Sequence, residues 1–495
     1  MEETRRQQLA SWLQKIDEVI ASGPYQDNWE SLVTHPTPRW YRDAKFGIFI
    51  HWGVYSVPAY CNEWYPRFMY KKDHEVFEHH RRTYGPQSAF GYKKFIPMFR
   101  AENFDPAAWA KLFRESGARY VMPVAEHHDG FQMYDSQLSD WTAAKMGPKR
   151  DVLGELKEAV QKEGLTFTAS SHRIEHYWFM AGLRQCESDL QGDPEYGDLY
   201  WPAKEEPFEE NGQNRVMGIR VDELFMQDWL VRCCELVEKY RPKVLYFDWW
   251  IQVEALKPYL KKFAAYYYNR AAAWGEEVTI NYKNDAFALG AATQDIERGQ
   301  LAQISPLFWQ TCNSVAKNSW GYTVGNDYKD PNDIICDLVD IVSKNGCLLL
   351  NVGPRSDGTI PEEDASILRS IGKWLAVNGE GIYGTTYWRI PGEGPTAVPS
   401  GAFTDQQRGA YTAEDFRFTR KGSTLYAFAM RWPEDGVVRI RSLGAVSDAF
   451  NGVIRSVEIL GYDGQVSWKR CESYLSVRAA ELSCDAPVCL RIRID

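Results

Sequence analysis

The sequence predicts a (β/α)8-type barrel followed by a C-terminal β-sandwich domain, and three observations support this. Eight short apolar runs lie between residues 46 and 352, and helical patterns separate most of them, which is the alternation typical of parallel strands. Each run ends in a polar or aromatic cluster, as expected where loops at the strand ends of a barrel carry the active site. After Trp388 the sequence changes to a Gly/Pro-rich linker and short alternating strands.

The predicted barrel strands follow one another along the first 390 residues. They are Phe46 to Ile50, Tyr120 to Val124, Thr166 to Ala169, Val244 to Phe247, Val278 to Ile280, Thr293 to Ile296, Leu307 to Trp309, and Cys347 to Leu350. Their end clusters are His51-Trp52, residues 126–129, His172, residues 248–250, residues 281–283, Glu297-Arg298, Gln310-Thr311, and Asn351. Helices are expected at 106–113, after Asp151, and at about 221–240, 254–274, 332–344 and 361–378.

Two further segments complete the predicted domain of residues 1–390. Met1 to Ser22 reads as an amphipathic helix, with apolar residues on one face. Residues 177–220 form an insertion without clear periodicity, which we expect to shape substrate access on the active-site face. The second domain, 391–495, contains predicted strands at 424–430, 437–442, 457–462 and 488–494.

Composition excludes several partners. The net charge of -10 disfavours nucleic acid and anionic membranes, and no segment is long and apolar enough to span a bilayer. The ten cysteines are scattered without a CxxC pair, which fits free thiols in a reducing compartment, and the N-terminus lacks the apolar core of a signal peptide. A cytoplasmic location is therefore expected, whereas the oligomeric state stays open.

Two carboxylates are the candidate catalytic groups. Asp248 closes the strand-like run that contains Tyr246 and is followed by two tryptophans, and Glu297 closes the sixth run. An acid among aromatic residues is poorly hydrated, so its charge must be paired or used. Two such acids on one barrel mouth suit glycoside hydrolysis, with one as nucleophile and one as proton donor. A capping role for Asp248 and an ion pair between Glu297 and Arg298 are the structural alternatives.

Histidines concentrate in the same clusters. Five of the nine lie at or just after strand ends: His51, His127, His128, His172 and His176. Neutral imidazole both donates and accepts hydrogen bonds, so binding of a polyhydroxylated ligand ranks first, ahead of a buried structural role. A metal site ranks third, because no HxH or HExxH spacing occurs. Glu63 and Trp64, after the first strand, would suit a hydroxyl acceptor beside a stacking ring.

Together these segments resemble the glycoside hydrolase family 29 α-L-fucosidases. The resemblance covers roughly residues 35 to 390 and rests on motifs that occur in the family's order. They are Trp40-Tyr41, Phe46-Gly47-Ile48-Phe49-Ile50-His51-Trp52-Gly53, Glu63-Trp64-Tyr65, His127-His128-Asp129-Gly130-Phe131, Ser139-Asp140-Trp141, Lys149-Arg150-Asp151, Phe247-Asp248, Ser319-Trp320-Gly321-Tyr322, residues 348–354 and Asn378-Gly379-Glu380.

The resemblance implies an exo-acting, retaining α-L-fucosidase that acts on a fucosylated oligosaccharide or glycoconjugate without metal or cofactor. Asp248 would be the nucleophile and Glu297 the acid/base. Implied or candidate fucose contacts are His51, Glu63, Trp64, His127, His128, His172, Tyr246, Lys283 and Trp320. A related α-L-galactosidase or transfucosidase, a non-catalytic sugar-binding barrel and a metal-dependent hydrolase are the competing readings.

Three positions depart from the family pattern. Gln310 stands where many members carry Glu, so this residue cannot be the acid, which favours Glu297. Lys283 stands where relatives often place Arg, which keeps the charge but loses the planar fork. The third strand ends in Ser170-Ser171-His172 instead of a Tyr-containing sequence, and we expect His172 to act as a substituting contact.

Overall fold

The barrel predicted from the alternating pattern is present in the computed structural model, which describes residues 2–205, 219–479 and 481–495. Nine strand segments pair in parallel in the order β1-β9-β8-β7-β6-β5-β4-β2-β3, and pairing of β1 with β2 closes the ring. The short β3 and β4 follow each other along one stave, which makes eight staves. Their bounds are β1 Phe46–Ile50, β2 Tyr120–Glu126, β3 Thr166–Phe167, β4 Ala169–Ser171, β5 Val244–Phe247, β6 Thr279–Tyr282, β7 Thr293–Glu297, β8 Trp309–Ser314 and β9 Gly346–Val352.

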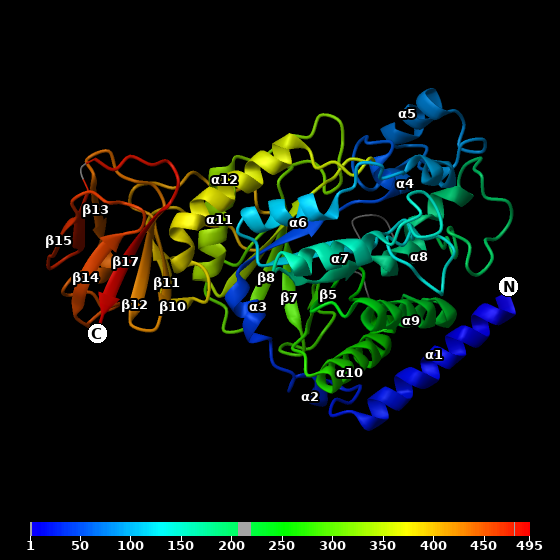
Figure 1. Cartoon of the computed structure of the whole chain (residues 1–495), viewed down its shortest axis with the longest axis horizontal. Coiled ribbons are helices and arrows are strands. Elements are labelled where there is room, and N and C mark those ends of the chain that lie inside the picture. Colours follow the sequence, from blue (N-terminus) through cyan, green and yellow to red (C-terminus); the bar gives the residue numbers. More distant parts are fainter. Residues whose placement is uncertain (1, 206–218, 480) are drawn as a thin grey trace.

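Helices surround the barrel (Figure 1). The longer ones are α1 Glu2–Ser22, α5 Glu75–Tyr84, α6 Pro106–Glu115, α7 Val152–Lys162, α9 Glu223–Tyr240, α10 Lys257–Trp274, α11 Pro331–Ser343 and α12 Glu362–Asn378, with α2 Trp29–Leu32, α3 Arg39–Ala44, α4 Tyr65–Phe68 and α8 His176–Phe179 as short turns. Side chains of Asp105, Asp151 and Asp330 cap α6, α7 and α11 by accepting backbone N–H bonds, which is why these helices begin where the sequence predicts. The N-terminal α1 packs along α9 and α10.

The seventh predicted strand was placed too early in the sequence. The run Leu307 to Trp309 ends where β8 begins, and Gln310 and Thr311 lie inside the strand. Gln310 is buried in the barrel interior, where its Nε2 donates to Asp295 Oδ1 at 2.8 Å and its Oε1 accepts from the hydroxyl of Tyr41. Because these polar side chains form hydrogen bonds with one another inside the barrel, the sequence of β8 lacks the apolar pattern of a buried strand and resembles a loop.

The C-terminal region forms two antiparallel sheets around a second apolar core, which includes Phe418, Leu425, Ile440, Val477 and Leu490. The larger sheet has the order β10-β11-β12-β17-β14 and the smaller β13-β16-β15. Their bounds are β10 Thr386–Glu393, β11 Phe416–Lys421, β12 Thr424–Ala429, β13 Val437–Ile440, β14 Ile454–Ile459, β15 Ser467–Arg470, β16 Leu475–Arg478 and β17 Val488–Ile494. β10 begins at Thr386, which precedes the predicted domain boundary at 391. The position of this boundary stays a prediction.

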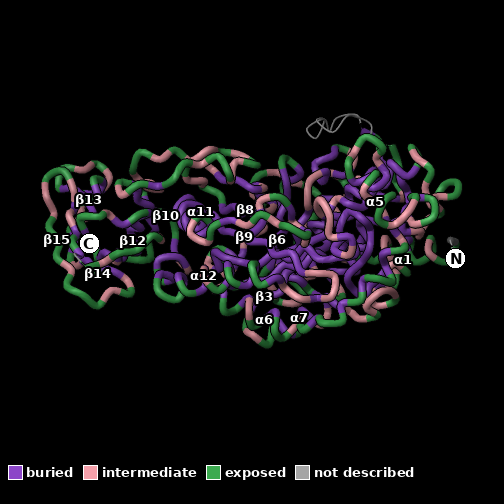
Figure 2. The backbone as a smooth tube through the Cα atoms, turned by 90° about the horizontal axis from the view of Figure 1, so that it is seen from above, coloured by how far each residue is buried: buried purple, intermediate pink, exposed green. Residues whose placement is uncertain are grey.

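The two domains are joined through α11 and α12 (Figure 1). Trp374 in α12 donates from its indole to the Pro487 carbonyl at 2.7 Å, and Arg417 in β11 pairs with buried Asp340 in α11. Figure 2 shows that the buried residues run continuously through the barrel towards these helices. Among the residues that the structure describes, none of the helices has the length and apolarity that a bilayer span requires.

Candidate active site

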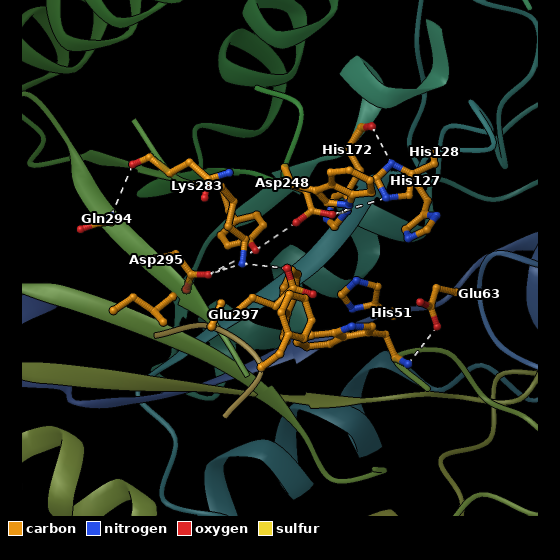
Figure 3. A pocket seen from close by; sticks show the side chains of 18 of the residues that line it. His51, Glu63, His127, His128, His172, Asp248, Lys283, Gln294, Asp295 and Glu297 are labelled. Carbon is orange, nitrogen blue, oxygen red and sulfur yellow. Dashed lines mark hydrogen bonds and ion pairs between the residues drawn. The ribbon is translucent and has the colours of Figure 1, made fainter. Parts of the chain in front are cut away.

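A cavity of about 690 Å³ opens at the carboxyl ends of the barrel strands, a volume within the range typical of small-ligand sites. All eleven residues proposed from the sequence as catalytic or binding line it: His51, Glu63, Trp64, His127, His128, His172, Tyr246, Asp248, Lys283, Glu297 and Trp320. Many of these side chains converge on one space in Figure 3. His176, the fifth strand-end histidine, does not line the cavity, and its Nδ1 instead donates to the His128 carbonyl at 2.6 Å.

Asp248 follows β5 and is held by cationic and polar neighbours. Its Oδ2 lies 3.1 Å from Nδ1 of His172 and 3.4 Å from Nε2 of His128, and the Tyr246 hydroxyl donates to Oδ1 at 3.4 Å. Burial by itself would raise the pKa of Asp248, but His172, His128 and Lys283 together lower it well below its ordinary value. Asp248 is therefore a carboxylate at neutral pH.

Glu297 is the last residue of β7 and has the opposite electrostatics. Burial and the negative charge of Asp248 raise the pKa of Glu297, although Lys283, whose Nζ lies 3.3 Å from Oε2, acts in the lowering direction. Lys283 is shared, because its Nζ also contacts Oδ2 of buried Asp295 at 2.6 Å. The site thus contains two carboxyl groups whose pKa values are displaced in opposite directions.

Glu63 and Asn351 fix the loop that carries Trp320. Oε2 of Glu63 accepts hydrogen bonds from the backbone N–H of Trp320 at 2.9 Å and of Gly321 at 3.2 Å, and from the Ser319 hydroxyl at 3.2 Å. The Asn351 amide donates to the Trp320 carbonyl at 2.7 Å. One Glu63 oxygen therefore anchors the loop, which leaves Oε1 for a ligand hydroxyl.

Two histidines in the cavity are neutral. Burial lowers the pKa of both His51 and His127 well below the ordinary value, and the charges of nearby histidines act in the same direction. Nδ1 of His51 lies 2.7 Å from the Asn351 side-chain oxygen, which can only accept, so His51 presents Nε2 as an acceptor. Nδ1 of His127 is buried without a hydrogen-bond partner in the described chain, which a ligand hydroxyl could supply.

His128 differs from these two because acidic groups surround it. Its Nδ1 donates to the His172 carbonyl at 3.1 Å, and its Nε2 faces both Asp248 and Glu175. Both ring nitrogens are engaged by the protein, so His128 holds Asp248 in place in addition to any contact with a ligand. Glu175 was not identified from the sequence, because it lies in a buried turn, residues 173–175, with no motif around it.

Aromatic rings form one side of the cavity. Trp64 stacks on Trp249 with ring centroids 5.6 Å apart and an interplanar angle of 7°. Phe179, at the start of the predicted insertion, packs edge-on against Trp64 and near His128. The described residues of 177–220 do not line the cavity, so this part supports the site from behind, and residues 206–218 lie outside the described chain.

Two groups of side chains in the described residues have atoms close enough for a shared metal ion: His51, His127 and His172, and His128, His172 and Asp248. Both overlap the hydrogen-bonded set above. Nδ1 of His51 is already bonded to Asn351, and Asp248 is balanced by two histidines. The geometry is also suited to a ligand rich in hydroxyl groups.

Several lining residues were not singled out from the sequence. Asn284 and Leu301 follow barrel strands, so the strand-end signal could have identified them, whereas Trp249 stood in a predicted strand-end cluster without a proposed role. Gly401, Ala402 and Phe403 come from between β10 and β11, more than 100 positions along the chain from Glu297. No sequence signal connects that segment with the barrel mouth.

A closed parallel barrel whose carboxyl end holds aromatic side chains and two carboxyl groups with oppositely shifted pKa values is typical of a glycoside hydrolase. The family model for alpha-L-fucosidase matches residues 12–380, and that for the alpha-L-fucosidase C-terminal domain matches residues 409–492. The chain belongs to the α-L-fucosidase family, as the sequence motifs predicted.

Known relatives agree over nearly the full length. The chain is 30% identical to the tissue alpha-L-fucosidase of Rattus norvegicus over 465 residues, covering 91% of this chain and 87% of the relative, and 30% identical to the Homo sapiens tissue enzyme over 451 residues, covering 90% and 85%. The crystal structure of the Thermotoga maritima alpha-fucosidase superposes with a TM-score of 0.73 at 29% identity, covering 94% of this chain and 100% of that one. The same Thermotoga maritima enzyme has been solved in complex with fucose.

Proposed function

We propose that this α-L-fucosidase is exo-acting and retaining, and that it hydrolyses terminal α-L-fucosyl residues through a covalent intermediate. The observation that carries the proposal is the opposite displacement of the two carboxyl pKa values, lowered at Asp248 and raised at Glu297. A nucleophile must be ionised and a general acid protonated at the same pH, and the two shifts favour the ionised form of Asp248 and the protonated form of Glu297.

In the first step Asp248 attacks the anomeric carbon from the face opposite the leaving group. The glycosidic C1–O bond breaks, and the carboxyl proton of Glu297 passes to the departing oxygen. The product is a β-fucosyl ester of Asp248. In the second step water attacks C1, its proton passes to the Glu297 carboxylate, and the ester electrons return to Asp248. Two inversions give net retention.

Sugar recognition follows from the neutral and anionic groups around the cavity. His51 offers an acceptor and His127 an unbonded ring nitrogen, while Oε1 of Glu63 can accept a hydroxyl proton. Trp320 and the stacked Trp64 provide apolar surfaces for the C5 methyl side and the ring faces. Such contacts aid catalysis most when they strengthen in the oxocarbenium-like transition state.

The shape of the cavity favours a terminal sugar of an oligosaccharide or glycoconjugate. Buried Tyr246 and Asp295 line the end of the cavity that faces the barrel interior, where Lys283 and Gln310 bond the Asp295 carboxylate. Because the interior of a barrel is packed with side chains, a sugar chain cannot pass through this end. A ligand therefore enters with its end first. An internal sugar of a polymer would need an open groove instead.

The stereochemistry of hydrolysis tests the proposal. Proton NMR during hydrolysis of an aryl α-L-fucoside should detect α-fucose as the first product, followed by slow mutarotation. First appearance of the β anomer would exclude the covalent mechanism. The matching aryl α-L-galactoside, run in parallel, tests the competing substrate, and a faster rate on it would overturn the assignment to fucose.

A further inference from the structure

Residues 401–405, here called the mouth segment, lie between β10 and β11, and the first three of them line the cavity mouth next to Glu297. The segment attaches to the residues that follow the acid at the end of β7. The Phe403 N–H donates to the carbonyl of Glu297 at 2.8 Å, and the Gly401 N–H donates to that of Gln300 at 2.9 Å. A side chain at Gly299 would meet the Gly401 carbonyl at 1.9 Å, so the two backbones are in direct contact.

Ion pairs fix the far end of the mouth segment. Asp405 pairs with Lys329 and lies 3.6 Å from Nη1 of Arg298, and the N–H groups of Thr404 and Asp405 both donate to the Arg298 carbonyl. Arg298 also donates to the carbonyls of Ala316 and Ser319. The segment is therefore held in one place relative to Glu297.

This anchoring presents an apolar ring to solvent at the mouth. Phe403 lines the cavity, yet it is 57% exposed, and its φ of 57° is in the left-handed region, which is uncommon for a large side chain. Folding alone gains little from an exposed ring in such a conformation. Apolar Leu301 and polar Asn284 and Gln294 also line the cavity on the β6–β7 side.

We propose that Phe403 forms the leaving-group subsite, where its ring packs on the apolar face of the pyranose that bears the fucosyl residue. The inference rests on the proposed role of Glu297. A general acid contacts the glycosidic oxygen, so the leaving group must lie on the Glu297 side of the fucosyl ring. Phe403, bonded to the carbonyl of Glu297 itself, lies on that side. Aromatic faces suit sugar rings, and Asn284 and Gln294 can meet the ring hydroxyls.

The test compares leaving groups of different size. The probes are the fucosyl disaccharide that the parental enzyme hydrolyses fastest, among α-1,2-, α-1,3-, α-1,4- and α-1,6-linked examples, and α-L-fucosyl fluoride, whose leaving group is a single atom. Phe403→Ala should lower kcat/KM on the disaccharide about 10-fold, chiefly through KM, and on the fluoride by less than about 2-fold. Phe403→Tyr, which keeps the ring, should restore the disaccharide rate.

Leu307→Ala is the matched control, because Leu307 is an exposed apolar residue that precedes β8, at the barrel end opposite the cavity. It should change neither rate. Equal losses on both probes in Phe403→Ala, or no loss on either, would overturn the subsite. A failure of the proposed function can be distinguished from a failure of the subsite. If the proposed function is wrong, the parental enzyme itself will not hydrolyse the fluoride with retention, and this is measured before any variant is made.

Discussion

Nε2 of His128 lies 3.4 Å from Oδ2 of Asp248, and on its other side the same nitrogen lies 3.2 Å from Oε2 of buried Glu175. Burial by itself would lower the pKa of His128, but the charge of Glu175 and the contact with Asp248 raise it to about 9. His128 is therefore a cation at neutral pH, and its charge helps to lower the pKa of Asp248. Glu175 thus acts on Asp248 through the imidazolium between them.

Glu175→Gln should lower the pKa of His128, because it removes the largest contribution that raises this pKa while burial still lowers it. Loss of the cation should raise the pKa of Asp248, so that the acidic limb of kcat/KM moves to higher pH and the rate at neutral pH falls roughly 10-fold, the size of a lost charge-assisted hydrogen bond of about 1.5 kcal/mol. NMR titration of the labelled histidines and a pH profile measure both effects. Glu235→Gln, another buried acid that bonds Ser136 and Gln137 away from the cavity, should leave both unchanged. An unshifted His128 titration would contradict the coupling.

Asp248→Gly should lower the rate of hydrolysis of all fucosides by roughly four to six orders of magnitude, because the first displacement has no nucleophile. Added azide can occupy the vacated space and attack C1 from the same face. The product should be β-fucosyl azide, inverted relative to the substrate. Formation of the α azide, or activity near the parental rate, would show that another carboxylate is the nucleophile.

Glu297→Ala should separate good from poor leaving groups. A nitrophenolate needs little protonation, so the fucosyl-enzyme should still form from an aryl fucoside, whereas natural fucosides should lose activity by about 100- to 10,000-fold. Azide needs no base and should rescue turnover, giving the α-fucosyl azide by attack on the β-linked intermediate. Near-parental turnover of natural fucosides would exclude Glu297 as the acid/base.

Lys283→Met should move both limbs of the pH profile of kcat/KM to higher pH. The Lys283 cation lowers the pKa of both Asp248 and Glu297, so its loss raises both values. Asp248 must be ionised, so activity is then lost earlier as pH falls, while Glu297 must be protonated, so activity persists further as pH rises. Lys283→Arg keeps the charge and should retain the parental limbs. In Lys283→Met the buried carboxylate of Asp295 loses the cation that it pairs with. A double variant that also carries Asp295→Asn removes this unpaired charge. If both limbs stay at their parental pH in Lys283→Met and in the double variant, Lys283 does not lower the pKa values of Asp248 and Glu297.

Chelation tests how the histidine cluster is used. If the histidines bind sugar hydroxyls, dialysis against EDTA should leave kcat and KM unchanged. Added Zn²⁺ should inhibit, because an ion shared by His128, His172 and Asp248 would occupy the nucleophile. Stoichiometric zinc in the purified protein, with activity lost on chelation and restored by zinc, would show a metal-dependent reaction instead.

The sequence by itself determined the barrel, the second domain and the candidate residues of the cavity. Strand ends in a parallel barrel meet at one face, so local patterns placed Asp248 and Glu297 together without knowledge of the packing. The limits of the strands were harder to predict. Gln310 resembled a loop residue because its hydrogen-bond partners, Asp295 and Tyr41, are distant in sequence.

The tertiary structure decided how these residues are tuned and what surrounds them. A pKa depends on burial and on charges within a few ångströms, and Glu175, which sets that of His128, carries no local signal. The mouth segment reaches Glu297 through backbone hydrogen bonds, which any residue except proline can donate, so its sequence does not reveal the contact. Sequence patterns record what each element requires of its own residues, and contacts between distant elements become visible when the chain is folded.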